Sequence, residues 1–267
     1  NKNYGLKILG TSEKIKEYKR NDFLDFIDKF YTSDNVVISI AGKLDENEAI
    51  DLVDKYFNQV FDNRKQTKIH KDIEFKFNSK VFIKNTKQSN IAIAFPTYSA
   101  MENSHVRSMF NYLTTGAMSS RLFQKIREEL GLVYDITFFS QTYTECGNIV
   151  LHLGTSNNLA TKALENIREE LDKIKSYGFT DDEVKMGKEQ LKLKVALMQE
   201  QAMSVMRTNS RMVSLFNKGL DIDEELKNID DIKPMDLLNY AKTYIDYNKM
   251  ASSYVGSDPN LDILKSF

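Results

Sequence analysis

Residues 236–256 read DLLNYAKTYIDYNKMASSYVG, and residues 22–42 read DFLDFIDKFYTSDNVVISIAG. The two stretches align without a gap at an offset of 236 − 22 = 214, and both carry apolar or aromatic residues at matching helical positions. This pattern indicates a repeated helix–strand unit, with a chance likeness between two ordinary helix–strand units as the alternative. The identical pairs include Asp22/Asp236, Leu24/Leu238 and Gly42/Gly256.

The repeat predicts one complete domain and the tail of another. The second unit starts near Lys76, but the matching start of the first unit falls before residue 1. We therefore expect residues 1–61 to be the C-terminal remnant of a first domain and the polar stretch 62–75 to be a linker. Residues 76–267 then form the complete second domain. Such a remnant cannot close its own core, so another segment or another chain has to complete it.

The remaining patterns predict the fold class. Residues 36–42, VVISIAG, read as a buried strand, and residues 134–155 read as a hairpin whose turn lies at 145–148. Apolar residues between 160 and 174 recur at steps of 4, 3, 4 and 3, which is typical of a helix with one buried face. Strands in hairpins with helices segregated between them predict an α+β fold with a largely antiparallel sheet packed by helices.

Composition excludes several classes of protein. The 267 residues include 37 Lys+Arg against 38 Asp+Glu, so the basic excess of a nucleic-acid-binding protein is missing. No apolar run approaches the ~18 residues of a membrane span. The only cysteine, Cys146, excludes an intrachain disulfide and a cysteine-based zinc site. The lone cysteine and the lack of a visible leader suit the cytoplasm.

The stretch GAMSSRLFQKIREELGLVY, residues 116–134, contains the strongest motif. Gly116 and the serines Ser119 and Ser120 read as a turn and a helix cap, and an apolar helix follows. Arg127 lies in its last turn, where a cation suits the helix dipole. Read alone, Arg127 is a solvated charge and Tyr134 an ordinary strand aromatic.

This segment resembles a motif in the C-terminal half of the pitrilysin/insulinase family of zinc peptidases, which includes the mitochondrial processing peptidase and its bacterial relatives. Residues 8–15 and 35–42 resemble further parts of the family, and the repeat fits its two similar α+β domains. The likeness extends from about Gly5 to Gly256. The motif residues are Met118-Ser119-Ser120-Arg121-Leu122-Phe123, Ile126-Arg127-Glu128, Gly131-Leu132 and Tyr134.

The resemblance implies a metallopeptidase that encloses peptides in a chamber between two half-shells. In this family an inverted H-x-x-E-H helix of the first domain and a distal Glu hold zinc, and the Glu within the motif is the general base. The second domain contributes an Arg and a Tyr seven residues apart, and Arg127 and Tyr134 match that spacing. A guanidinium and a phenol can hold a peptide carbonyl and stabilise negative charge on it.

The zinc motif is absent from this chain. None of its three histidines, His70, His105 and His152, is followed by x-x-E-H. Because zinc sites need clustered donors, we read these histidines as structural or solvated. We therefore expect this chain to contain no metal ligand and no general base. The chain alone should bind no zinc and should hydrolyse no peptide. Zinc is expected as the cofactor of the full-length enzyme.

The sequence therefore predicts the C-terminal part of a zinc-dependent metalloendopeptidase that acts on peptides or unfolded polypeptides. Either a missing N-terminal half-domain or a homologous subunit, in a homodimer or heterodimer, would complete the chamber. The alternative is a non-catalytic subunit that completes the chamber of a zinc-bearing partner. A third interpretation, an unrelated α+β binding module, requires both the repeat and the motif to arise by chance.

Overall fold

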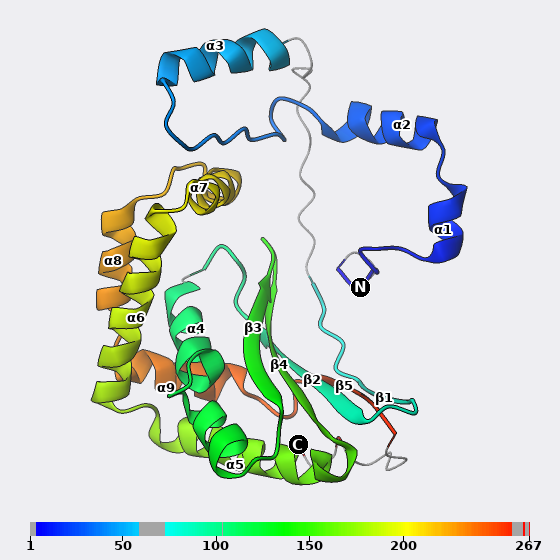
Figure 1. The fold of residues 1–267 in the computed structure, drawn as a ribbon, viewed down its shortest axis with the longest axis vertical. Coiled ribbons are helices and arrows are strands. Elements are labelled where there is room, and N and C mark those ends of the chain that lie inside the picture. The colour runs from blue at the N-terminus through cyan, green and yellow to red at the C-terminus, as the bar shows by residue number, and fades with distance from the viewer. Residues whose placement is uncertain (1–3, 59–72, 103, 258–263, 265–266) are drawn as a thin grey trace. The chain divides into compact units, whose positions relative to one another are not determined.

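We analysed a computed structural model that describes residues 4–58, 73–102, 104–257, 264 and 267 (Figure 1). The chain divides into two compact units. The first contains Asn1–Glu74 and Leu197–Leu220, and the second contains Phe75–Ala196 and Asp221–Phe267. The range 76–267, expected to form one domain, thus includes a segment that groups with the first unit. Most of the expected linker lies outside the described residues.

A five-stranded sheet in the order β1-β5-β2-β4-β3 forms the centre of the second unit. Only β1 and β5 pair in parallel, whereas β5–β2, β2–β4 and β4–β3 are antiparallel. This arrangement confirms the predicted α+β class with a largely antiparallel sheet. The strands are β1 (Ser79–Ile83), β2 (Gln88–Thr97), β3 (Asp135–Thr142), β4 (Gly147–Ser156) and β5 (Ala251–Gly256).

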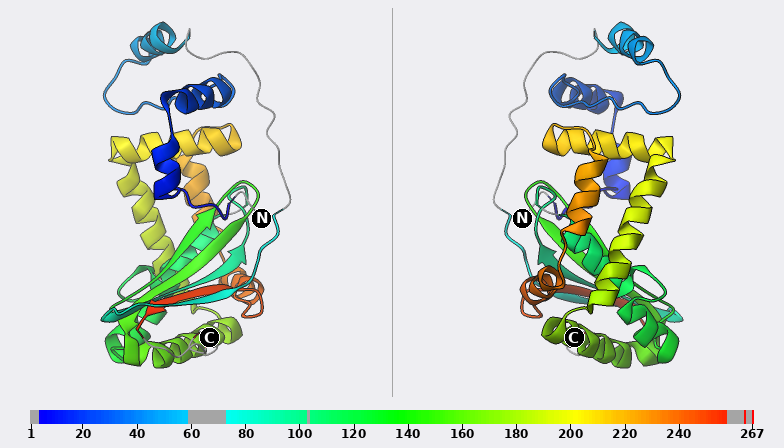
Figure 2. Two further views of the ribbon diagram at one scale, coloured as in Figure 1. Left: turned by 90° about the vertical axis from the view of Figure 1, so that its right-hand side faces the viewer. Right: turned by 90° about the vertical axis from the view of Figure 1, so that its left-hand side faces the viewer.

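Helices of the second unit cover one face of this sheet. Figure 2 shows the strands toward the viewer in its left view and helices of the second unit, among them α6 and α8, toward the viewer in its right view. The five predicted apolar positions of α5, from Ala160 to Ile174, are fully buried, which confirms the 4-3-4-3 pattern. The helical elements are α4 (Ser104–Asn111), η1 (Tyr112–Gly116), η2 (Phe123–Glu129), η3 (Asn157–Leu159), α5 (Ala160–Tyr177), α6 (Asp181–Gln199), α8 (Ile222–Asp230) and α9 (Pro234–Tyr244).

The first unit contains α1 (Ser12–Glu17), α2 (Arg20–Phe30), α3 (Glu46–Phe57) and α7 (Ala202–Phe216). Its α2 supports the repeat, because its bounds shifted by the offset of 214 are those of α9. Both helices begin with the same cap. The backbone N–H of Lys19 donates to Asp22 at 2.8 Å, and that of Lys233 donates to Asp236 at 2.8 Å.

The strand expected at residues 36–42 does not form, so that prediction was wrong. Ile38 and Ile40 are 41% and 53% exposed. A strand needs neighbours for its backbone N–H and C=O groups, and no strand within the described ranges pairs with these residues. Their counterparts in the second unit form β5, which is paired on both sides. The matching stretch of the second unit has a partner strand on each side, and the described residues give the first copy none.

Candidate functional site

The motif begins at a turn between the two π-helical segments η1 and η2. The Ser120 backbone N–H and hydroxyl both donate to the carbonyl of Ala117, at 3.0 and 2.6 Å. Ser120 is buried, whereas Ser119 is exposed. At Gly116 an added Cβ would lie 3.1 Å from the ring of Tyr112, which is a tight approach. Ser120 and Gly116 therefore shape the turn that precedes the arginine-bearing helix.

Arg121 fixes this turn to the start of α6. Its Nε and one terminal nitrogen donate to the two carboxylate oxygens of Glu183, each at 2.7 Å. The guanidinium also lies over the ring of Phe179, 4.9 Å from its centroid. The backbone N–H of Thr180 donates to the same carboxylate, and the backbone N–H of Glu183 donates to the Thr180 hydroxyl, so the two residues form a capping box. Burial pushes the pKa of Glu183 up, but the hydrogen bonds from Arg121 and Thr180 hold this pKa below its usual value.

Arg127 lies in the last turn of η2 and is 42% exposed. Its guanidinium lies over the ring of Phe123 at 4.7 Å and 3.8 Å from a carboxylate oxygen of Glu128. The chain leaves the helix at Gly131, whose φ of +59° is in the left-handed region that favours glycine. This geometry keeps the guanidinium at the surface and directs the following residues into β3.

Tyr134 precedes β3 and is 54% exposed. Its backbone N–H donates to the carbonyl of Gly154 at 2.8 Å, and its hydroxyl lies 2.8 Å from the Oγ of Ser156. Tyr134 is thus held against the last residues of β4. The two motif residues have separate immediate partners, and both side chains are accessible to a ligand.

The structure adds a pair that the motif did not reveal. The carboxylate of Asp135 lies 3.1 Å from Nδ1 of His152, and both side chains project from the face of the sheet opposite the buried Leu151 and Leu153. Because these residues are 17 positions apart in sequence (152 − 135), only the β3–β4 register brings them together. The sequence offered no signal for this pair beyond the hairpin itself.

The other candidate groups have structural surroundings. His105 lies 2.8 Å from a carboxylate oxygen of Glu225, and His70 is outside the described residues. Cys146 is buried, and this burial raises the pKa of its thiol. In the part of the chain that the structure describes, no three His, Cys, Asp or Glu side chains group so as to hold a metal ion. Nor does any described helix have the length and apolar character to span a membrane.

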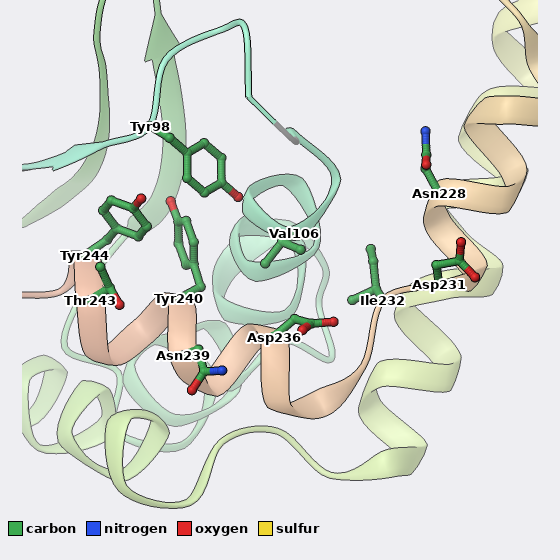
Figure 3. A pocket seen from close by; sticks show the side chains of 10 residues that line it. All are labelled: Tyr98, Val106, Asn228, Asp231, Ile232, Asp236, Asn239, Tyr240, Thr243 and Tyr244. Atoms are coloured by element: carbon green, nitrogen blue, oxygen red, sulfur yellow. The ribbon is translucent and has the colours of Figure 1, made fainter.

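A cavity of about 520 Å³ lies beside α4, α8 and α9, away from the motif residues (Figure 3). Tyr98, Tyr240 and Tyr244 pack edge to face or tilted at one end, and Asp231 and Asp236 lie toward the other. Burial raises the pKa of Tyr98 to about 12. None of the predicted site residues lines this cavity.

Comparison with known proteins identifies the family of the chain. Residues 18–191 match the family model described as "Peptidase M16 inactive domain". The chain therefore belongs to the M16 peptidase family, which confirms the resemblance to zinc peptidases.

The chain is similar to several curated proteins that are longer than itself. It is 30% identical over 236 residues to an uncharacterized zinc protease, YmxG, of Bacillus subtilis, covering 87% of this chain and 56% of that protein. It is 25% identical over 281 residues to the mitochondrial-processing peptidase subunit beta of Saccharomyces cerevisiae, covering 98% and 61%. The chain thus spans little more than half the length of these relatives.

Solved structures share the fold at low sequence identity. A protease from Helicobacter pylori superposes with a TM-score of 0.83 at 16% identity, covering 93% of this chain and 61% of that one. A chain of complex III2 from Candida albicans gives a TM-score of 0.79 at 18% identity, covering 98% and 65%. These matches show the fold. At such low identity they say nothing about the activity of this chain.

Proposed function

We propose that this chain is the C-terminal part of a zinc-dependent metalloendopeptidase that cleaves peptides or unfolded polypeptides in an enclosed chamber. Its role is to position the substrate and to stabilise the oxyanion that forms at the scissile carbonyl. The observation that carries this proposal is that Arg127 and Tyr134, both exposed, lie on either side of the turn in one anchored helix–turn–strand segment.

The chemistry of the two side chains suits this role. A guanidinium and a phenol both donate hydrogen bonds, and donors fixed in place before the reaction stabilise developing negative charge well. The bidentate Arg121–Glu183 pair anchors the start of the helix, and the Tyr134–Ser156 contact anchors the far end of the segment. We infer that these anchors hold the two donors in a fixed relation to each other.

The described residues do not fit a zinc site, because they contain no cluster of metal-binding side chains. Within the proposal, zinc and the general base belong to a part of the protein outside this chain. Two relatives are named zinc proteases, and both are longer than this chain. These facts support a zinc site in a part of the protein outside this chain.

We propose further that residues 1–61 are the remnant of the zinc-bearing first domain, joined by a linker at 62–75 to the second domain at 76–267. Among the described residues of the first segment, apolar side chains remain exposed, including Ile38, Ile40 and Tyr56. Two hollows of about 410 and 270 Å³ lie along α3 and the stretch 36–44. An N-terminal half-domain would cover these surfaces. The single cysteine agrees with a cytoplasmic location.

A second function is favoured by other observations. The matching family model is described as inactive, and one relative is named as a subunit of the mitochondrial-processing peptidase. The chain could then belong to a non-catalytic subunit that completes the chamber of a zinc-bearing partner in a homodimer or heterodimer. Arg127 and Tyr134 favour the peptidase, because a scaffold has no need for a pair of exposed donors.

The intact mass and activity of the natural gene product separate the two functions. The peptidase proposal expects a product longer than this chain by about 140–170 residues, on the repeat and ordinary domain size. It also expects chelator-sensitive cleavage of unfolded peptides by that product and none by the 267-residue chain. A natural product that truly starts at Asn1 would favour the subunit, and chelator-sensitive cleavage by the chain alone would contradict both functions.

A further inference from the structure

His152 and Ser156 place polar side chains on the uncovered face of β4. Along this strand, His152, Gly154 and Ser156 alternate with Leu151, Leu153 and Thr155, which are fully buried against the helices. Successive side chains of a strand point to opposite faces, so the first three residues share the face that the helices leave uncovered.

The residues directly opposite His152 in the sheet are small. In the sheet register His152 lies between Ala92 of β2 and Thr137 of β3, and Ala92 in turn pairs with Ser253 of β5. The His152 side chain is 35% exposed. A ligand lying on this face can therefore reach the ring without displacing a large side chain.

The carboxylate of Asp135 lies beside that ring. This carboxylate extends over Gly154, where an added Cβ would collide with it, and reaches Nδ1 of His152 at 3.1 Å. A carboxylate that faces Nδ1 can accept a hydrogen bond from a proton held there, and the tautomer of a neutral imidazole with its proton on Nδ1 would suit this contact. The other nitrogen, Nε2, is then a hydrogen-bond acceptor for groups on the open face.

The spacing along β4 links this acceptor to the proposed site. Ser156, which contacts the Tyr134 hydroxyl, lies four residues from His152 on the same face. At ~3.3 Å per residue, four residues of strand span ~13 Å, and four residues of an extended peptide span the same distance. A peptide held with its scissile carbonyl at Tyr134 and lying along β4 would bring its fourth residue to His152.

We propose that His152, oriented by Asp135, is a substrate-binding residue that accepts a hydrogen bond from the substrate side chain about four positions from the scissile bond. This inference rests on the proposed function, since it needs a peptide held at Tyr134. It adds a specificity determinant outside the Arg127–Tyr134 motif, and it gives Asp135 the role of a positioning residue.

The test uses the full-length enzyme and a peptide series with one fixed cleavage site. Each peptide carries glutamine, whose amide donates hydrogen bonds, at one position from one to five residues on either side of the scissile bond, with leucine there as the reference. The variants are His152→Leu, His152→Gln and Asp135→Asn. The control is His105→Leu, which removes a histidine that also has a carboxylate partner but lies on α4.

We expect His152→Leu to raise KM ~5-fold for peptides that carry glutamine about four positions from the cleaved bond. This change corresponds to the loss of one hydrogen bond. Leucine peptides should show no change. His152→Gln should restore part of the loss because its amide oxygen can accept, and Asp135→Asn should reproduce the loss because it no longer fixes the tautomer. The control should leave KM unchanged for every peptide.

Two outcomes would overturn the inference, one of them alone and the other together with the proposed function. Equal KM values for the His152 variants and the parent enzyme, in an enzyme that remains sensitive to Arg127→Ala, would overturn this inference alone. A full-length protein that cleaves no peptide, or that ignores Arg127→Ala, would overturn the proposed function and this inference with it. Unchanged thermal unfolding of Asp135→Asn would separate a lost contact from a lost fold.

Discussion

The hydroxyl of Tyr134 lies 2.8 Å from the Oγ of Ser156, which attaches the end of the sequence motif to the last residue of β4. Neither residue is buried, so this contact serves to orient the phenol more than to stabilise the core. The serine was not part of the motif, and its place beside Tyr134 depends on the β3–β4 pairing.

Replacing Ser156 with alanine should therefore weaken catalysis while leaving the fold intact. Without its partner, the Tyr134 phenol samples more orientations, and we expect kcat/KM of the full-length enzyme to fall ~2- to 5-fold, about the effect of one neutral hydrogen bond. Steady-state kinetics measure the change. Ser214→Ala is the matched control, because that hydroxyl donates to a carbonyl within α7. Equal effects of both substitutions would argue against an orienting role.

The Arg121–Glu183 pair should contribute more to stability than the exposed pair in the same segment. Its side chains are 23% and 27% exposed and share two hydrogen bonds of 2.7 Å, so Arg121→Ala should cost about 1.5–3 kcal/mol. Urea unfolding of the chain measures this loss. Lys125→Ala, which breaks an exposed ion pair with Glu129, should have a much smaller effect. Similar losses in the two variants would contradict the anchoring role.

The same carboxylate predicts a pH dependence of stability. The folded-state pKa of Glu183 lies below its ordinary value of 4.5, so the stability it confers is present above that value and is lost as pH falls through the folded pKa. Glu183→Gln should therefore be less stable than the parent at pH 7, and this difference should shrink below pH ~4. Unfolding free energies measured from pH 7 to pH 3 test the sign. A difference that grows in acid would contradict it.

Gly131 should resist substitution because of its backbone. Its φ of +59° costs an L-residue with a Cβ about 1 kcal/mol, although the space around it is open. Gly131→Ala should lower the unfolding free energy by that amount, whereas Gly131→Asn should lose less, because asparagine tolerates this region better. Thermal or urea unfolding distinguishes the two variants. An alanine variant as stable as the parent would show that the turn is free to rearrange.

Sequence patterns predicted the parts of the fold that depend on local periodicity. The buried face of α5 follows from the spacing of apolar residues close in sequence. The hairpin turn lies slightly earlier than expected, with the Tyr143 N–H donating to the carbonyl of Cys146 at 2.7 Å. Two or three neighbouring polar residues can form a turn here, and the strand register decides among them.

Other features depend on distant partners and could not be predicted in this way. Residues 36–42 have strand-forming side chains, but β-structure needs a neighbouring backbone that the described chain does not give them. Arg121 meets Glu183 across 62 positions, and His152 meets Asp135 through register alone. The motif identified Arg127 and Tyr134 as candidates, but only the structure shows how each is held.

The kinetics of Arg127→Ala and Tyr134→Phe in the full-length enzyme test the central claim most directly. If the two side chains hold the scissile carbonyl and stabilise its negative charge, each substitution should lower kcat/KM ~10²-fold, with a normal fold by circular dichroism. Lys125→Ala, an exposed cation in the same helix, should leave kcat/KM unchanged. Unchanged kinetics in correctly folded Arg127 and Tyr134 variants would contradict the claim.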